Sequence, residues 1–123
     1  MTRLVVDTSA LAALVFSEPG GEALAARLDG ATVFAPTLLK FELANVAWKK
    51  ATRQPDDTAA LLMALERALD DRWGVIWQDV DHADAVLVAQ ATGLSTYDAS
   101  YLWLAGSLGA DLVTLDRRLA STP

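Results

Sequence analysis

The sequence contains no cysteine and a single histidine, His82. The chain therefore forms no disulfide, and it lacks the cysteine and histidine clusters that usually bind Zn²⁺. A bound metal ion would need oxygen ligands, and such sites favour Mg²⁺ or Mn²⁺. Oxygen ligands are plentiful, since the chain has 16 aspartate and glutamate residues. We interpret His82 as a surface residue of a helix, because no catalytic partner is recognisable for it.

Long apolar runs are also missing. No apolar stretch reaches about 18 residues, and no apolar segment follows a basic stretch at the N-terminus. We therefore expect a cytoplasmic protein with no membrane segment. A chain of 123 residues is typical of one domain, so we predict a single domain over residues 1–123.

Apolar residues are nevertheless abundant, at 53% of the chain. This exceeds the usual share of about 45–50%. It indicates either helices that are apolar on more than one side or a surface that is buried against a partner. The tryptophans are compatible with both interpretations, because this residue is common in cores and at interface hot spots. They are Trp48, Trp73, Trp77 and Trp103.

Positive charge is scarce, and the formal net charge is −6. Taken alone, this argues against nucleic-acid binding. The lysines Lys40, Lys49 and Lys50, together with Arg53, nevertheless lie close together in the sequence. They predict a local basic side on one helix, and bound divalent cations would offset part of the negative charge. The acidic total therefore does not exclude a nucleic-acid substrate.

The order of apolar runs and turn residues predicts alternating strands and helices. Strands are expected at 3–7, 31–35, 75–77 and 111–115, and helices at 9–16, 22–28, 38–53, 57–73, 82–92, 97–108 and 117–120. Short strands separated by helices predict an α/β domain with a mainly parallel sheet of about four strands. The pair Gly20-Gly21 lacks the flanking strand and lysine of a phosphate-binding loop, so we interpret it as a turn.

Two acidic residues directly follow predicted strands. Asp7 follows the first strand and Asp116 follows the last one. In open parallel sheets, functional sites form outside the carboxyl ends of the strands. The alternative for both residues is an ordinary helix cap, since a helical segment follows each of them.

Two further acids lie within apolar helical segments. Glu42 has Leu38, Leu39 and Val46 as helical neighbours, and an unpaired acid in such a stripe is costly. The alternatives for Glu42 are access to water or an ion pair with Lys49. Asp98 lies near the start of its helix, where it would serve equally well as a capping residue.

A shared metal site explains these four acids more economically than four separate structural explanations. Clustered carboxylates repel one another, and a divalent cation removes that repulsion. Such a cation can activate water and stabilise the leaving oxygen of a phosphodiester. Ser9 and Thr114 lie two residues from Asp7 and Asp116, respectively, and would orient a carboxylate or water. Helix capping by Ser9 and simple strand propensity of Thr114 remain alternatives.

Four segments of the sequence resemble the PIN-domain family, and most closely the VapC-type toxins of toxin–antitoxin pairs. They are Val-Val-Asp-Thr-Ser-Ala-Leu at 5–11, Phe-Glu-Leu-Ala-Asn-Val at 41–46, Thr-Tyr-Asp-Ala-Ser-Tyr-Leu-Trp-Leu-Ala at 96–105 and Leu-Val-Thr-Leu-Asp-Arg-Arg-Leu at 112–119. Each motif is short, but together they occur in the family's order and cover nearly the whole chain.

The resemblance implies a three-layer α/β sandwich and a Mg²⁺- or Mn²⁺-dependent endoribonuclease that leaves 5′-phosphate and 3′-hydroxyl ends on RNA. It also implies a homodimer and an antitoxin whose C-terminal segment blocks the site. Asn45 matches a polar position of the family, and Ser9 matches a small hydroxyl position. The family's acidic positions fall on the four acids already identified: Asp7, Glu42, Asp98 and Asp116.

One feature departs from the family pattern. Relatives commonly continue into a fifth strand, whereas seven residues follow Asp116 here. We therefore expect four strands and a less firmly held Asp116.

Two other classes of function compete with the nuclease. A phospho-accepting receiver domain would need a lysine late in the chain, and none follows Lys50. A non-catalytic PIN-like module that only binds a partner remains the main alternative.

Overall fold

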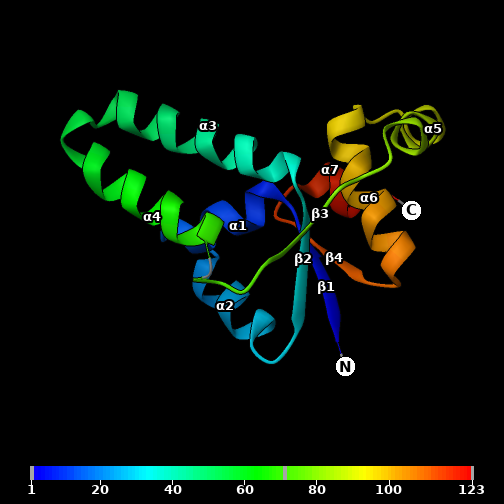
Figure 1. Cartoon of the computed structure of the whole chain (residues 1–123), viewed down its shortest axis with the longest axis horizontal. Helices are drawn as coiled ribbons and strands as arrows, with labels where there is room; N and C mark the ends of the chain where they lie inside the picture. Colours follow the sequence, from blue (N-terminus) through cyan, green and yellow to red (C-terminus); the bar gives the residue numbers. More distant parts are fainter. Residues whose placement is uncertain (1, 71, 123) are drawn as a thin grey trace.

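The computed structural model describes residues 2–70 and 72–122. Its sheet consists of parallel strands in the order β3-β2-β1-β4 (Figure 1). The strands are β1 (Arg3–Val6), β2 (Thr32–Pro36), β3 (Ile76–Gln78) and β4 (Asp111–Val113). The predicted four-stranded parallel sheet is therefore confirmed in the described part of the chain.

Helices cover both faces of this sheet. They are α1 (Thr8–Val15), α2 (Gly21–Leu28), α3 (Leu38–Arg53), α4 (Thr58–Asp70), α5 (His82–Thr92), α6 (Thr96–Leu108) and α7 (Arg117–Ala120), with a 3-10 turn, η1 (Pro55–Asp57), before α4. In Figure 1, α5 and α6 lie on one side of the sheet and α1 to α4 on the other. This arrangement confirms the predicted three-layer α/β sandwich.

The hydrophobic core is centred on β1. Its residues Leu4, Val5 and Val6 are at most 2% exposed, because α6 packs on β1 from one face and the helices of the other layer cover the opposite face. A strand covered on both faces is apolar without alternation, as the sequence of β1 shows. The carboxyl end of this buried strand places Asp7 at the centre of one edge of the sheet.

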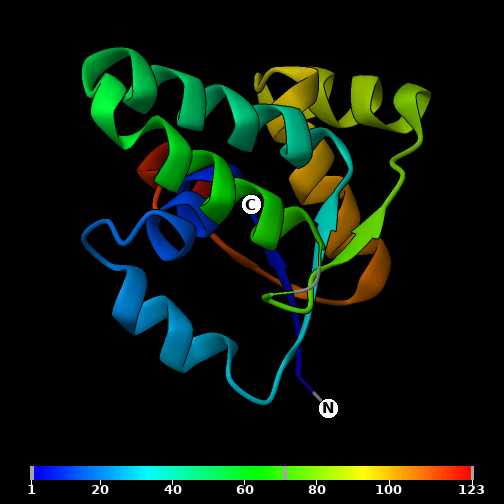
Figure 2. The same ribbon diagram turned by 60° about the vertical axis from the view of Figure 1, so that its left-hand side comes forward.

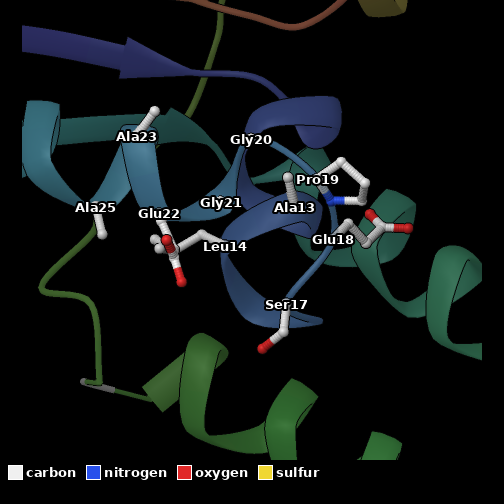
Figure 3. Close-up of a pocket in the computed structure, with 10 residues that line it drawn as sticks. All are labelled: Ala13, Leu14, Ser17, Glu18, Pro19, Gly20, Gly21, Glu22, Ala23 and Ala25. Carbon is white, nitrogen blue, oxygen red and sulfur yellow. The ribbon is translucent and has the colours of Figure 1, made fainter.

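Helices α1 and α2 meet at a tight corner that explains the Gly20-Gly21 pair. A side chain at Gly21 would place its Cβ 2.4 Å from the backbone oxygen of Ala13, and Gly20 has a φ of +92°. Glycine at position 21 avoids the clash, and glycine at position 20 avoids the strain of a positive φ. The pair therefore forms a turn, as predicted. Figure 3 shows the adjacent hollow, whose lining includes Ser17, Glu18 and Glu22 but none of the four candidate acids.

Two element boundaries differ from the sequence prediction by more than one residue. Strand β4 ends at Val113 instead of Leu115, because β4 pairs only with β1 and the last paired residue of β1 is Val6. Helix α4 ends at Asp70 instead of Trp73. The position immediately after Asp70 lies outside the described residues.

The residue at the start of α3 does not cap the helix with its side chain. Thr37 precedes α3, but its side chain makes no capping hydrogen bond there. Its hydroxyl instead donates to Asp79 at 3.2 Å. The cap of α5 is Asp81, which accepts from the N–H of Asp84 at 2.9 Å.

The tryptophans divide between the core and the surface. Trp73, Trp77 and Trp103 are partly buried against the core, whereas Trp48 on α3 is 63% exposed. Helices α3 and α4 lie side by side as an antiparallel pair, which Figure 2 shows along its length. Across the two described segments, no helix has the length and apolar character required to cross a lipid bilayer.

The predicted basic side of α3 is not a single patch. Lys40 lies over the ring of Trp77, with 5.1 Å between Nζ and the ring centroid. Lys50 points elsewhere and forms an ion pair with Glu18 at 2.6 Å. Helical geometry separates these lysines because side chains ten residues apart do not share a face.

Candidate active site

The four candidate acids come from elements that end or begin at the carboxyl edge of the sheet. Asp7 follows β1 and Asp116 follows β4, while Glu42 lies in the second turn of α3 and Asp98 in the first turn of α6. The N–H of Asp7 donates to the backbone oxygen of Val113 at 3.2 Å. This bond joins the ends of β1 and β4, so that the segments after both strands share one corner.

Asp7 is an almost fully buried carboxylate, only 4% exposed. Its Oδ1 accepts from the hydroxyl of Ser9 at 2.8 Å and from the N–H of Ala10 at 3.0 Å. Its Oδ2 accepts from the hydroxyl of Thr114. The bond from Ala10 confirms that Asp7 caps α1. Oδ2 accepts one hydrogen bond from the described residues, which leaves a lone pair for a cation.

Ser9 and Thr114 tie Asp7 to the loop after β4. The Ser9 hydroxyl accepts from the N–H of Leu115 at 2.9 Å, and the Thr114 hydroxyl accepts from the N–H of Asp116 at 2.9 Å. Since each hydroxyl gives its one proton to Asp7, their 3.3 Å contact is not an additional hydrogen bond. Ser9 is therefore not the helix cap, and Thr114 lies outside the strand; both hold the Asp7 carboxylate.

Glu42 is held by two other hydroxyl groups. Its Oε1 accepts from Thr8 at 2.8 Å and from Tyr101 at 2.5 Å. Glu42 is half-buried, and the described residues include no ion pair between it and Lys49. The ion-pair alternative is therefore wrong.

The sequence reasoning missed Tyr101 as a partner of Glu42. The one signal in the sequence was its spacing: Tyr101 lies three residues after Asp98 in an apolar helix, which places both side chains on one face. Burial raises the pKa of the Tyr101 hydroxyl far above its ordinary value of 10, and the hydrogen bond to Glu42 raises the pKa further. The hydroxyl therefore stays protonated near neutral pH and can donate to Glu42.

Asp98 is not a capping residue. The cap of α6 is Ser95, whose hydroxyl accepts from the N–H of Asp98 at 3.1 Å. The carboxylate of Asp98 accepts no hydrogen bond from any residue that the structure describes. Burial raises the pKa of Asp98 above its ordinary value of 3.8, and the negative charges of Asp116 and Asp7 raise it further, against an opposing effect of Arg118. Asp116 and Asp7 are thus close enough to repel the carboxylate of Asp98.

Asp116 is exposed and caps α7. Its Oδ1 accepts from the N–H of Arg118 at 2.9 Å and from the N–H of Leu119 at 3.3 Å. The capping alternative is therefore confirmed for Asp116. Its second oxygen accepts no hydrogen bond within the described part of the chain, so capping does not occupy the whole carboxylate.

The chemistry of these side chains fits a hard divalent cation. All available ligand atoms are oxygens, and a cation would cancel the repulsion from Asp116 and Asp7 that adds to the effect of burial in raising the pKa of Asp98. Over residues 2–70 and 72–122, however, no three aspartate, glutamate or histidine side chains are gathered into a ready set of metal ligands. The four acids would have to move closer together to bind one ion.

Two other residues identified in the sequence lie away from these contacts. Asn45 is exposed on α3, one turn after Glu42. His82 is exposed at the start of α5, which confirms its assignment to a helix surface.

Comparisons with known proteins agree with this architecture. The PIN domain model matches residues 4–123. Ribonuclease VapC3 of Pyrobaculum aerophilum is 33% identical over 128 positions, which cover 96% of this chain and 92% of the relative. Ribonuclease VapC12 of Mycobacterium tuberculosis is 30% identical over 121 positions, which cover 97% and 91%.

A solved structure shows the same fold. The crystal structure of PAE2754 from Pyrobaculum aerophilum aligns with a TM-score of 0.75 at 30% identity, covering 96% of this chain and 77% of that one. The family match and the relatives each extend over nearly the whole chain. The chain therefore belongs to the PIN-domain family, and within that family it is of the VapC type.

Proposed function

We propose that this protein is an endoribonuclease that hydrolyses RNA phosphodiester bonds with the help of Mg²⁺ or Mn²⁺. The observation behind this proposal is the geometry of Asp7: a buried carboxylate held by two hydroxyls, with a free lone pair, whose negative charge acts on the neighbouring carboxylate of Asp98. The names of the two aligned ribonucleases support RNA as the substrate.

The four acids share one role in this proposal. Asp7, Glu42, Asp98 and Asp116 would hold the cation through oxygen atoms that hydrogen bonds leave available. The bound cation would supply an activated water and neutralise charge on the phosphodiester, which would leave 5′-phosphate and 3′-hydroxyl ends. Ser9 and Thr114 would keep Asp7 oriented throughout, since both donate their hydroxyl protons to it.

The proposal is tested with a covalently closed circular RNA, which only an endonuclease can open. We expect cleavage by the wild type with Mg²⁺ or Mn²⁺ and none in excess chelator. Asp7→Asn keeps an oxygen that can cap α1 but removes the negative charge, so the rate should fall at least about a hundredfold while circular dichroism shows a folded protein.

The matched control for this test is Asp56→Asn. Asp56 is an exposed acid in η1, in the turn after α3 and outside the four-acid group. We expect it to cleave at the wild-type rate. Cleavage in chelator, or equal rates for wild type and Asp7→Asn, would contradict the proposed metal site.

A non-catalytic module that binds a partner is the second candidate function. The lack of a ready set of metal ligands among the described acids favours it. The circular-RNA assay separates the two candidates, because the module should leave the RNA intact with either cation although the protein is folded.

The proposal includes an antitoxin partner and a homodimer. Large apolar side chains are exposed on the α3–α4 pair, among them Phe41 at 86%, Trp48 at 63% and Met63 at 55%. Apolar surface of this kind is typical of interaction sites. Light scattering after size-exclusion chromatography tests the homodimer: we expect twice the chain mass for wild type and a smaller mass for Phe41→Ser with Trp48→Ser.

A further inference from the structure

We propose that Tyr101 and Thr8 are positioning residues that hold one oxygen of Glu42, so that the other oxygen is presented to the cation site. This inference rests on the proposed function, because it requires a cation at the carboxyl edge of the sheet. It assigns a task to two hydroxyl groups that do not themselves contact the reacting atoms.

The hydrogen bonds define which oxygen of Glu42 is available. Thr8 and Tyr101 both donate to Oε1, at 2.8 Å and 2.5 Å. Their oxygens are 2.9 Å apart, but each hydroxyl has one proton, and both protons are already donated to Glu42. The two lone pairs of Oε1 are thereby used. Oε2 accepts no hydrogen bond from the residues described, so it is the oxygen left for a cation.

The two hydroxyls come from the elements that bear the other acids. Tyr101 lies on the same face of α6 as Asp98, three residues further on, and is 1% exposed. Thr8 directly follows Asp7. The two bonds therefore connect α3, which bears Glu42, to α6, which bears Asp98, and to the start of α1, which Asp7 caps. They hold Glu42 in register with the remaining acids, although 59 residues separate it from Tyr101.

A related but different arrangement occurs at Asp7. There Ser9 and Thr114 also donate one proton each to the carboxylate, but Ser9 donates to Oδ1 and Thr114 to Oδ2, whereas both donors of Glu42 share Oε1. A half-buried glutamate could satisfy its hydrogen bonds with water. Two donors on a single oxygen instead restrict how the carboxylate can turn, which is what a metal ligand requires.

The test measures Mn²⁺ binding by calorimetry on the full chain without RNA. Tyr101→Phe removes only the hydroxyl, and we expect the Kd for Mn²⁺ to rise about tenfold, as for other residues that orient a metal ligand. Thr8→Val should give a smaller rise in Kd. Tyr97→Phe is the matched control: it makes the same change on the same helix, at a tyrosine that is 64% exposed, and should bind Mn²⁺ like the wild type.

The dependence of cleavage on Mn²⁺ concentration gives a second readout. We expect Tyr101→Phe to need about ten times more Mn²⁺ for half-maximal cleavage and to recover most of the wild-type rate at saturation. A residue that only stabilised the fold would lower the melting temperature without this shift.

The outcomes separate the inference from the function on which it rests. An unchanged Kd for Mn²⁺ in folded Tyr101→Phe and in Thr8→Val would overturn the inference while leaving the metal site intact. Failure of the wild type to bind Mn²⁺ would overturn the proposed metal site and the inference with it. If Tyr101→Phe does not fold, Thr8→Val decides the matter alone, because Thr8 is only half-buried.

Discussion

Asp7 and Asp98 have the same type of side chain and lie at the same edge of the sheet, but they differ in burial and in hydrogen bonding. Asp7 is 4% exposed, and both of its oxygens accept hydrogen bonds. Asp98 is half-exposed, and its carboxylate accepts none from the described residues. The comparison shows that hydrogen bonds integrate Asp7 into the fold, whereas no hydrogen bond from the described residues holds the carboxylate of Asp98.

The difference arises from the capping positions. Asp7 is itself the cap of α1, so the N–H of Ala10 and the hydroxyls of nearby loops converge on it. At α6 the cap is Ser95, which leaves Asp98 inside the first turn with no bond to make. Asp116 differs from both, because it is a cap like Asp7 but is exposed, more so than the half-exposed Asp98.

The largest expected difference between the two acids is in the free energy of unfolding. Asp7→Ala removes a helix cap and leaves two hydroxyl donors without their acceptor, so it should lower this free energy by about 2–4 kcal/mol. Asp98→Ala removes no hydrogen bond and should change it by less than about 0.5 kcal/mol. Urea denaturation in chelator measures both. Equal losses would contradict the distinction drawn between them.

A smaller effect is expected at Asp116, where capping and charge can be separated. Asp116→Ala should lower the free energy of unfolding by about 1 kcal/mol, because the N–H groups of Arg118 and Leu119 lose their acceptor. Asp116→Asn keeps that acceptor and should retain most of the stability. The same denaturation experiment measures both variants. Equal destabilisation by the two would show that the charge, and not the cap, is what matters.

The smallest effect concerns the charge of Asp98 without a metal. Its pKa is raised in the folded protein, first by burial and then by Asp116 and Asp7. A raised pKa means that the contribution of Asp98 to stability is complete below its ordinary pKa of 3.8 and is lost as the pH rises through the raised value. Asp98→Asn should therefore raise the melting temperature near pH 7 by at most a few degrees.

Thermal melts of Asp98→Asn and wild type in chelator check this sign. The difference between them should shrink as the pH is lowered toward 3.8 and should reverse when Mn²⁺ is added, since the wild type would bind the cation more tightly. The control is Asp56→Asn, which should show neither behaviour. A large loss of stability in Asp98→Asn near pH 7 would mean that the carboxylate has a structural partner.

Much of the fold was predictable because its signals are local. The β-branched run before Asp7 predicted β1, and turn residues such as Gly93 and Gly109 marked the ends of α5 and α6. The end of β4 was not predictable, because it depends on where β1 stops offering backbone partners. The prediction of one basic side on α3 was wrong for a similar reason: Lys40 and Lys50 contact different residues on other parts of the fold.

The sequence by itself determined the parallel α/β sheet and the acids that stand at its carboxyl edge, because strand ends and helix starts follow from short-range patterns. Only the tertiary structure decided which hydroxyl holds which acid. Thr114 reaches Asp7 across 107 positions of the chain, and Tyr101 reaches Glu42 across 59. These pairings depend on how β4 lies beside β1 and how α6 packs on the sheet, and no local pattern specifies either.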